Sequence, residues 1–288
     1  MSAKNPEYDF NWCPGCGDFG VRRALEFALR DYSAKHETPM AANAVIAGIG
    51  CSGNLVHLLE GEQPFGFHGI HGRALPIAFG AKIARPDLNV VTVTGDGDFL
   101  SIGMEHIAPQ AARNINLTAV VMDNGVYGLT KGQASPTTAM DVVTSSTPFG
   151  KLEAPVRPLD LYLSLGVTFI ASGYSSKPRD LARLMLAGME HDGFSIVHVA
   201  SPCTSYNDTY EFLKGNKAQG IEPGGWAISE DHDPSSLDAA RAVLAKGGVP
   251  LGVVYENTER VSLDSRLADI RERNTPKSVD SLLSVYAI

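Results

Sequence analysis

Short apolar runs alternate along the chain with stretches whose apolar residues recur every three or four positions. The first such stretch has apolar side chains at 21, 24, 25, 28, 29 and 32, which predicts an amphipathic helix. Helical patterns also cover 72–86 and 101–114, each with an internal proline that predicts a kink or a helix start. Three short apolar runs between these patterns predict buried strands at 43–50, 88–94 and 117–122.

The second half of the chain continues the alternation. A strand is predicted at 167–172, a helix at 176–191, a strand at 194–200, and a last helix and strand over about 236–255. Two stretches lack a clear period: 130–160, a long loop of the kind that often carries function, and 201–235, with a short helix near 208–214. The alternation predicts an α/β fold with a parallel sheet and helices on both of its faces.

Composition limits the classes of protein. The 288 residues suffice for one large domain or two modest ones, and 44% hydrophobic residues supply a core. A formal net charge of −8 argues against nucleic-acid binding, which needs clustered Lys and Arg. No apolar run reaches about 18 residues, so no membrane span is expected. The polar start MSAKNPEYDFNW lacks the apolar segment of a signal peptide, and we expect a cytoplasmic protein.

Two polar turns follow neighbouring predicted strands. GDGD at 95–98 follows one strand, and DNGVYGLT at 123–130 follows the next, so that Asp96 and Asn124 lie 28 positions apart. In an open parallel sheet, ligands bind beyond the carboxyl ends of the strands. Glycines there allow close approach of a phosphate, and Asp and Asn oxygens suit Mg²⁺. Each turn alone is a common loop sequence, but their joint placement favours a shared cation site.

The four cysteines also gather at predicted loop positions. Cys13 and Cys16 form a C-x-x-C pair, and Cys51 and Cys203 each follow a predicted strand. Such a set is compatible with half of a zinc site, a redox dithiol or ligands of an iron–sulfur cluster. The two single cysteines are equally compatible with buried apolar positions, as free cysteines often are.

The two turns resemble the thiamine diphosphate-binding motif. That resemblance implies that Asp96, Asn124 and the carbonyl of Val126 hold Mg²⁺. It further implies that the diphosphate and thiazolium are lined by Gly97, Asp98, Gly128 and Leu129. The motif commonly ends in two asparagines, whereas this chain has Asp123 at the first of them.

Four segments together resemble the beta subunits of 2-oxoacid:ferredoxin oxidoreductases, over about residues 10–215. These segments are WCPGCGDFG, GIGCSGN, the stretch from HGIHGR to GDGDFLSIG, and DNGVYGLTKGQASPTT. The resemblance implies that Cys13, Cys16, Cys51 and Cys203 hold a [4Fe-4S] cluster. It also implies cofactor contacts at Ile49, Gly50 and Ser52, and a catalytic role for His71 near the cofactor. The form WCPGCGD is most similar to the 2-oxoglutarate branch.

The resemblance implies oxidative decarboxylation of 2-oxoglutarate to succinyl-CoA and CO₂, reversibly. Thiamine diphosphate would serve as electron sink, and the cluster would pass electrons to ferredoxin. Residues 1–200 would form the cofactor-binding domain with its cluster-binding segment. Residues 201–288 would form an extension on the same domain or on a partner. An alpha subunit would supply the pyrimidine-binding domain, its Glu, and groups for CoA and the 2-oxoacid, in a heterodimer or a dimer of heterodimers.

Three other functions remain open from the sequence. The first is the same chemistry on pyruvate or another 2-oxoacid. The second is a thiamine enzyme without a cluster, in which the cysteines are accidental. The third is a non-catalytic zinc- or nucleotide-binding module. Metal content separates the last of these from the cluster-containing enzyme.

Overall fold

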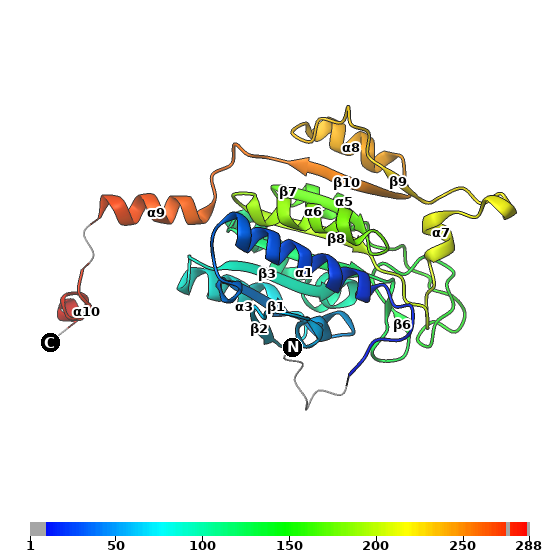
Figure 1. The fold of residues 1–288 in the computed structure, drawn as a ribbon, viewed down its shortest axis with the longest axis horizontal. Helices are drawn as coiled ribbons and strands as arrows, with labels where there is room; N and C mark the ends of the chain where they lie inside the picture. Colours follow the sequence, from blue (N-terminus) through cyan, green and yellow to red (C-terminus); the bar gives the residue numbers. More distant parts are fainter. Residues whose placement is uncertain (1–9, 275–276, 287–288) are drawn as a thin grey trace.

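The computed structural model of the protein describes residues 10–274 and 277–286. The polar stretch 1–9, to which the expectation of no signal peptide mostly refers, lies outside the described residues. Within the described part, eight strands form one sheet in the order β2-β1-β3-β4-β8-β7-β10-β9, and two more form a small hairpin (Figure 1). The strands are β1 (Asn43–Ala47), β2 (Phe65–His68), β3 (Asn89–Gly95), β4 (Leu117–Asp123), β5 (Val126–Tyr127), β6 (Gln133–Ala134), β7 (Phe169–Tyr174), β8 (Phe194–Ala200), β9 (Gly225–Ala227) and β10 (Val249–Glu256).

Helices cover both faces of the sheet, as the alternation predicts. One core lies between the sheet and α1, α2 and α6, and a second lies between the sheet and α3, α4, α5 and α8. The α-helices are α1 (Asp18–Lys35), α2 (Leu55–Leu58), α3 (Ala74–Ala84), α4 (Ile107–Arg113), α5 (Pro158–Ser164), α6 (Pro178–Glu190), α7 (Tyr210–Lys214), α8 (Leu237–Ala245), α9 (Leu263–Arg273) and α10 (Val279–Leu283). The α/β class with two covered faces is therefore confirmed.

The sheet departs from the prediction at its edges. Strand β10 runs antiparallel to β7, so the sheet is mostly rather than wholly parallel. The sequence predicts a strand there, but apolar content does not reveal strand direction. Two short edge strands, β2 and β9, are not predicted by the sequence pattern. In β2 the side chains of Phe65 and Phe67 are exposed, so the strand lacks the buried pattern that identifies central strands.

The predicted helix 101–114 is shorter and interrupted. A π-helical turn (Asp98–Ile102) and a 3₁₀ turn (Met104–His106) precede α4. The break falls at Gly103, whose amide donates to the carbonyl of Asp98 and whose backbone lies against Gly72. Pro109 lies in the first turn of α4, where a missing N–H removes no helical hydrogen bond. The long loop 130–160 is found, with β6 near its start and α5 beginning at its end.

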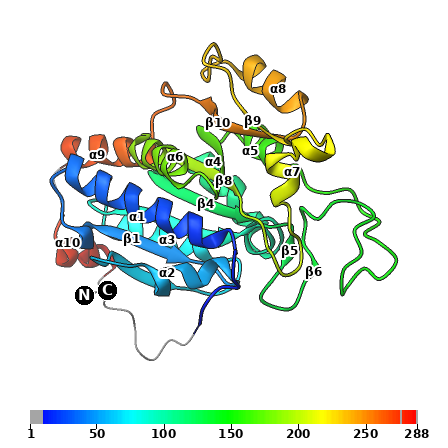
Figure 2. The same ribbon diagram turned by 45° about the vertical axis from the view of Figure 1, so that its right-hand side comes forward.

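The C-terminal helices lie at the end of the molecule opposite the β5–β6 hairpin. Helix α9 is attached there by Asp264, which accepts a hydrogen bond of 2.7 Å from the amide of Asn116, just before β4. Figures 1 and 2 both place α9 and α10 beyond the amino ends of the central strands. Among the described residues, no helix has the length and apolar character needed to cross a lipid bilayer.

Two helical glycines make a matched pair for testing how α1 is held. A Cβ added to Gly20 in α1 would lie 2.0 Å from the carbonyl oxygen of Ser175, whereas one added to Gly80 in α3 would meet nothing within 4 Å. We expect Gly20→Ala to lower the free energy of unfolding by about 1–3 kcal/mol, through overpacking against a backbone atom. Gly80→Ala should raise it by about 0.5–1 kcal/mol, because alanine favours the helix. Urea denaturation measures both, and equal effects would contradict the close approach at Gly20.

Candidate functional site

A small cavity lies beyond the carboxyl ends of β1, β3 and β4. Its volume is about 90 Å³, and its walls include every residue predicted to bind the cofactor or Mg²⁺. These residues are Ile49, Gly50, Cys51, Ser52, His71, Asp96, Gly97, Asp98, Asn124, Val126, Gly128 and Leu129. Strands β3 and β4 are paired in parallel, with Gly95 opposite Met122, so the two polar turns leave the sheet side by side. The structure therefore brings these sequence positions into one cavity.

Asp96 is almost wholly buried at this edge, with 1% of its surface exposed. Its Oδ2 accepts a hydrogen bond of 2.7 Å from the hydroxyl of Thr137. Burial, and then the charge of neighbouring Asp123, raises the pKa of Asp96 to about 7, while hydrogen bonds from Ser135 and Thr137 act in the opposite direction. A buried carboxyl beside a second carboxylate is a place where a cation would be favourable.

Asp98, at the wall of the same cavity, makes several hydrogen bonds within the protein. It is buried, and its carboxylate accepts hydrogen bonds from the amide of Ile49 (3.2 Å), the amide of Gly72 (2.7 Å) and the hydroxyl of Thr94 (2.5 Å). It is also paired with Nδ1 of His71. Asp98 therefore ties together two loops of the cavity and orients His71, which remains one-third exposed at the cavity wall.

The loops that carry Cys13, Cys16 and Cys203 are joined by hydrogen bonds. Gly17 donates to the carbonyl of Pro202 (3.0 Å), and the Thr204 hydroxyl donates to the carbonyl of Pro14 (3.0 Å). The Tyr210 hydroxyl donates to the carbonyl of Gly15 (2.9 Å). Two segments almost 190 positions apart in sequence are thus fixed to each other.

Electrostatics also indicate that the four thiols lie near one another. Burial, and then Asp18, raises the pKa of Cys16, and the charges of Cys203 and Cys51 add to this effect. Burial, and then Asp18, likewise raises the pKa of Cys51 to about 12, with contributions from Cys203 and Cys13. Within residues 10–274 and 277–286, no three His, Cys, Asp or Glu side chains are placed to hold a single metal ion. The thiols therefore converge without forming a closed one-ion site.

The thiol loops meet the polar turns at Gly128. A Cβ added there would lie 3.6 Å from Sγ of Cys51, 3.9 Å from Sγ of Cys203 and 3.9 Å from Nδ2 of Asn124. Asn207, in the turn that follows Cys203, donates a hydrogen bond of 2.8 Å to the carbonyl of Asn124. The cysteines and the predicted metal ligands therefore belong to one continuous site.

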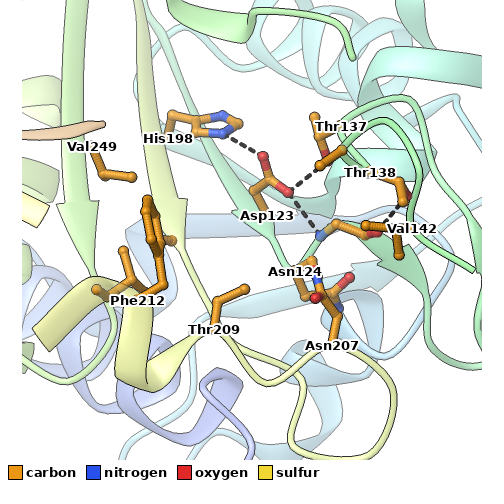
Figure 3. A pocket seen from close by; sticks show the side chains of 14 residues that line it. Asp123, Asn124, Thr137, Thr138, Val142, His198, Asn207, Thr209, Phe212 and Val249 are labelled. Carbon is orange, nitrogen blue, oxygen red and sulfur yellow. Dashed lines mark hydrogen bonds and ion pairs between the residues drawn. The ribbon is translucent and has the colours of Figure 1, made fainter. Parts of the chain in front are cut away.

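A second, larger cavity of about 420 Å³ is also lined by Asn124 (Figure 3). Its wall holds a hydrogen bond of 3.0 Å between Asp123 and His198, and Thr137 lies beside Asp123. Sequence reasoning missed Thr137 and His198. Thr137 lies in the loop 130–160, where no periodicity suggests a position, and His198 lies in an otherwise apolar strand.

Comparison with known proteins identifies the family. Residues 48–199 match the family described as thiamine pyrophosphate enzyme, C-terminal TPP binding domain. The 2-oxoacid:ferredoxin oxidoreductase 2 subunit beta of Aeropyrum pernix is 36% identical over 90% of this chain and 84% of its own length. The chain belongs to the family of 2-oxoacid:ferredoxin oxidoreductase beta subunits. The predicted resemblance is confirmed.

Two further relatives refine the position within this family. The 2-oxoglutarate synthase subunit KorB of Archaeoglobus fulgidus is 37% identical over 71% of this chain and 76% of its own length. A solved 2-oxoglutarate:ferredoxin oxidoreductase from Magnetococcus marinus, with 2-oxoglutarate, coenzyme A and succinyl-CoA bound, is 38% identical. It superposes with a TM-score of 0.85, covering 98% of this chain and 94% of that one. Both the predicted fold class and the similarity to the 2-oxoglutarate branch are confirmed.

Proposed function

We propose that this protein is the beta subunit of a 2-oxoglutarate:ferredoxin oxidoreductase. In the forward direction 2-oxoglutarate and CoA give succinyl-CoA and CO₂, and two electrons pass one at a time to two oxidised ferredoxins. The observation that carries the proposal is the meeting at Gly128, where Cys51, Cys203 and Asn124 surround one backbone position. A thiamine site directly against a thiol set suits a reaction that withdraws electrons from the cofactor.

The residues of the smaller cavity fit Mg²⁺ and a diphosphate. Asp96, Asn124 and the Val126 carbonyl supply only oxygen ligands, which Mg²⁺ prefers. The raised pKa of Asp96 agrees with a cation site, because a cation beside this carboxyl would stabilise its ionised form. Gly97 and Gly128 bring their backbone to the cavity wall, where a Cβ at Gly97 would lie 2.3 Å from the Tyr127 ring, and Ile49, Gly50, Ser52 and Leu129 complete the walls. When bound, thiamine diphosphate supplies the electron sink for decarboxylation.

The four cysteines fit an iron–sulfur cluster better than zinc. A [4Fe-4S] cluster is larger than one ion, so its four thiolates stand farther apart than the ligands of a single zinc. Cys51 and Cys203 approach the same backbone position at Gly128, and the hydrogen bonds of Gly17 and Thr204 join the Cys13–Cys16 and Cys203 loops, which supports one group shared by these thiols. The pKa values of Cys16 and Cys51 are raised for the same reason as that of Asp96, namely burial first and then a neighbouring negative charge.

His71 and Asp98 are proposed to act as a pair. The Asp98 carboxylate holds Nδ1 of His71, so Nε2 is the ring nitrogen left to meet a substrate or cofactor in the cavity. Nε2 of a His oriented in this way can donate to, or accept from, a developing oxyanion or hydroxyl group. Asp98 thus helps to shape the site in two ways, by orienting His71 and by binding the amides of the two loops.

The proposal requires a partner subunit. Pockets that enclose ligands of drug size measure about 300–1,000 Å³, whereas this cavity measures about 90 Å³. A second chain, the alpha subunit, would cover the cofactor and supply the pyrimidine-binding domain with its Glu, in a heterodimer or a dimer of heterodimers. Residues 1–200 would bind the cofactors and 201–288 would form the extension, of which β9 and β10 join the same sheet. Free cysteines are typical of reducing compartments, which supports a cytoplasmic location for the assembly.

The isolated chain is expected to show no 2-oxoglutarate decarboxylation, whereas the chain co-purified with its alpha subunit is active. The reason is that the groups holding the pyrimidine end of the cofactor are supplied by the other chain. The measurement is CoA-dependent reduction of ferredoxin, without oxygen, for the chain alone and for the complex. Full activity of the isolated chain would contradict the requirement.

The same complex tests the substrate. We expect a higher kcat/KM for 2-oxoglutarate than for pyruvate or a branched-chain 2-oxoacid. A preference for pyruvate would keep the reaction class and overturn the assignment to the 2-oxoglutarate branch. The Aeropyrum pernix relative is described only as a 2-oxoacid:ferredoxin oxidoreductase subunit, and this description supports another 2-oxoacid as the second candidate substrate.

A further inference from the structure

A chain of hydrogen bonds runs from the proposed metal ligand Asp96 into the body of the sheet. The hydroxyl of Thr137 lies 2.7 Å from Oδ2 of Asp96 and 2.8 Å from Oδ1 of Asp123. Oδ2 of Asp123 lies 3.0 Å from Nε2 of His198, and Nδ1 of His198 lies 3.3 Å from the hydroxyl of Tyr162. Figure 3 shows the central part of this chain on the wall of the larger cavity.

The members of this chain come from rigid elements. Asp96 follows β3, Asp123 ends β4, and His198 lies in β8, the strand paired with β4. Tyr162 on α5 is wholly buried, and His198 is 8% exposed. Thr137 is the one member on a loop, and its neighbour Thr138 fixes that loop through a hydrogen bond of 2.5 Å to the carbonyl of Gly125.

The geometry gives Thr137 and Asp123 distinct effects on Asp96. By holding Oδ2, the Thr137 hydroxyl fixes the rotation of the Asp96 carboxylate. The same hydroxyl lies within hydrogen-bond distance of Asp123, although its single proton can be donated to only one of the two carboxylates at a time, and Asp123 adds a second negative charge near the cation. His198 in turn fixes Oδ2 of Asp123, so this carboxylate cannot rotate away from Thr137. This arrangement also accounts for an aspartate where the motif commonly has asparagine, since His198 offers it a partner.

We propose that Thr137, Asp123 and His198 are positioning residues that hold Asp96 for Mg²⁺ and set the affinity of the cation site. The inference rests on the proposed function, because it takes Asp96 as the metal ligand. None of the three residues needs to touch the cation. They act as the partners behind metal ligands commonly do, by fixing orientation and increasing the local negative charge.

The test is a Mg²⁺ titration of the alpha–beta complex at a fixed, saturating concentration of thiamine diphosphate, followed by calorimetry. We expect Thr137→Val to weaken Mg²⁺ binding by about 10- to 100-fold, the usual effect of removing a residue behind a metal ligand. Thr137→Ser keeps the hydroxyl and should restore affinity to near the wild-type value. Thr147→Val, in the same loop, removes a hydroxyl that bonds only within the loop, to the Val142 carbonyl and Thr144, and should change nothing.

A double-mutant cycle tests whether the residues act as one chain. Asp123→Asn preserves the shape of the side chain and removes its charge, so it should also weaken Mg²⁺ binding. Because Thr137 links the two carboxylates, the double variant Thr137→Val/Asp123→Asn should lose less affinity than the sum of the single losses, in free-energy terms. Strict additivity would overturn the coupling.

The outcomes also separate this inference from the proposed function. Mg²⁺ binding within twofold of wild type in Thr137→Val would overturn the inference and leave the proposed function intact. Failure of the wild-type complex to bind Mg²⁺ with thiamine diphosphate would overturn both. A loss in Thr137→Val that Thr137→Ser does not restore would assign the effect to packing of the loop and overturn the positioning role.

Discussion

Replacing Asp96 with Asn is expected to weaken binding of Mg²⁺ with thiamine diphosphate by more than about 100-fold, since even residues behind metal ligands contribute about 10- to 100-fold. The substitution removes the one buried carboxylate among the proposed ligands and keeps its size. Without the charge, the site has only amide and carbonyl dipoles to offset dehydration of the cation. CoA-dependent reduction of ferredoxin should fall in parallel, because the cofactor is held through the metal.

Asp87→Asn is the matched control. Asp87 lies at the opposite end of β3 from Asp96, in an exposed pair with Arg85. Exposed pairs contribute little, so this variant should bind the cofactor and turn over as the wild type does. Calorimetry with Mg²⁺ and thiamine diphosphate measures binding in both variants. Unchanged cofactor affinity in Asp96→Asn would remove this residue from the metal site.

The central part of the fold could be predicted because its signals are local. Buried central strands such as β3 and β4 are continuous apolar runs, and α1 has an uninterrupted helical period. The predicted strands also give the position of the two polar turns, because neighbouring parallel strands have their carboxyl ends at the same edge of the sheet. What failed to be predicted depends on contacts between distant segments. The direction of β10 is set by its pairing with β7. The break before α4 is set by the close approach of Gly103 to Gly72.

In the site, too, residues with a local sequence signal could be predicted, and residues that depend on distant contacts could not. Asp96, Asn124 and the cysteines were found because each follows a strand or forms a recognised spacing. The role of Asp98 in joining two loops was not foreseen, because its partners at Ile49 and Gly72 lie 49 and 26 positions away. His198 belongs to no motif, and Thr137 stands near the end of the segment DNGVYGLTKGQASPTT, where its residue type alone reveals no role. They become visible only when the loop 130–160 and β8 are placed beside β4.

Replacing Cys203 with Ser is expected to remove the cluster and, with it, electron transfer to ferredoxin. A [4Fe-4S] cluster needs four thiolates, and a serine hydroxyl at one corner is a far weaker ligand at neutral pH. In protein purified without oxygen, iron and acid-labile sulfide should fall from about four of each per chain to well below that value. Thiamine diphosphate binding should persist, because Cys203 reaches the cofactor cavity only from behind Gly128.

Ser205→Ala, two positions along the same turn, is the control for disturbance of the loop, and it should keep both cluster and activity. Two of the alternative functions give different results for Cys203→Ser. If a thiamine enzyme carried accidental cysteines, the variant would retain full turnover, and the wild type would hold no iron. In a zinc-binding module, zinc would replace iron in the wild type, and no 2-oxoacid would be consumed. Loss of iron together with ferredoxin reduction, while the cofactor still binds, is the one result that unites the thiol set and the metal turns in a single electron path. Cys51, Cys203 and Asn124 all approach the same backbone position at Gly128, so residues that would hold the cluster and the cation are neighbours in this site.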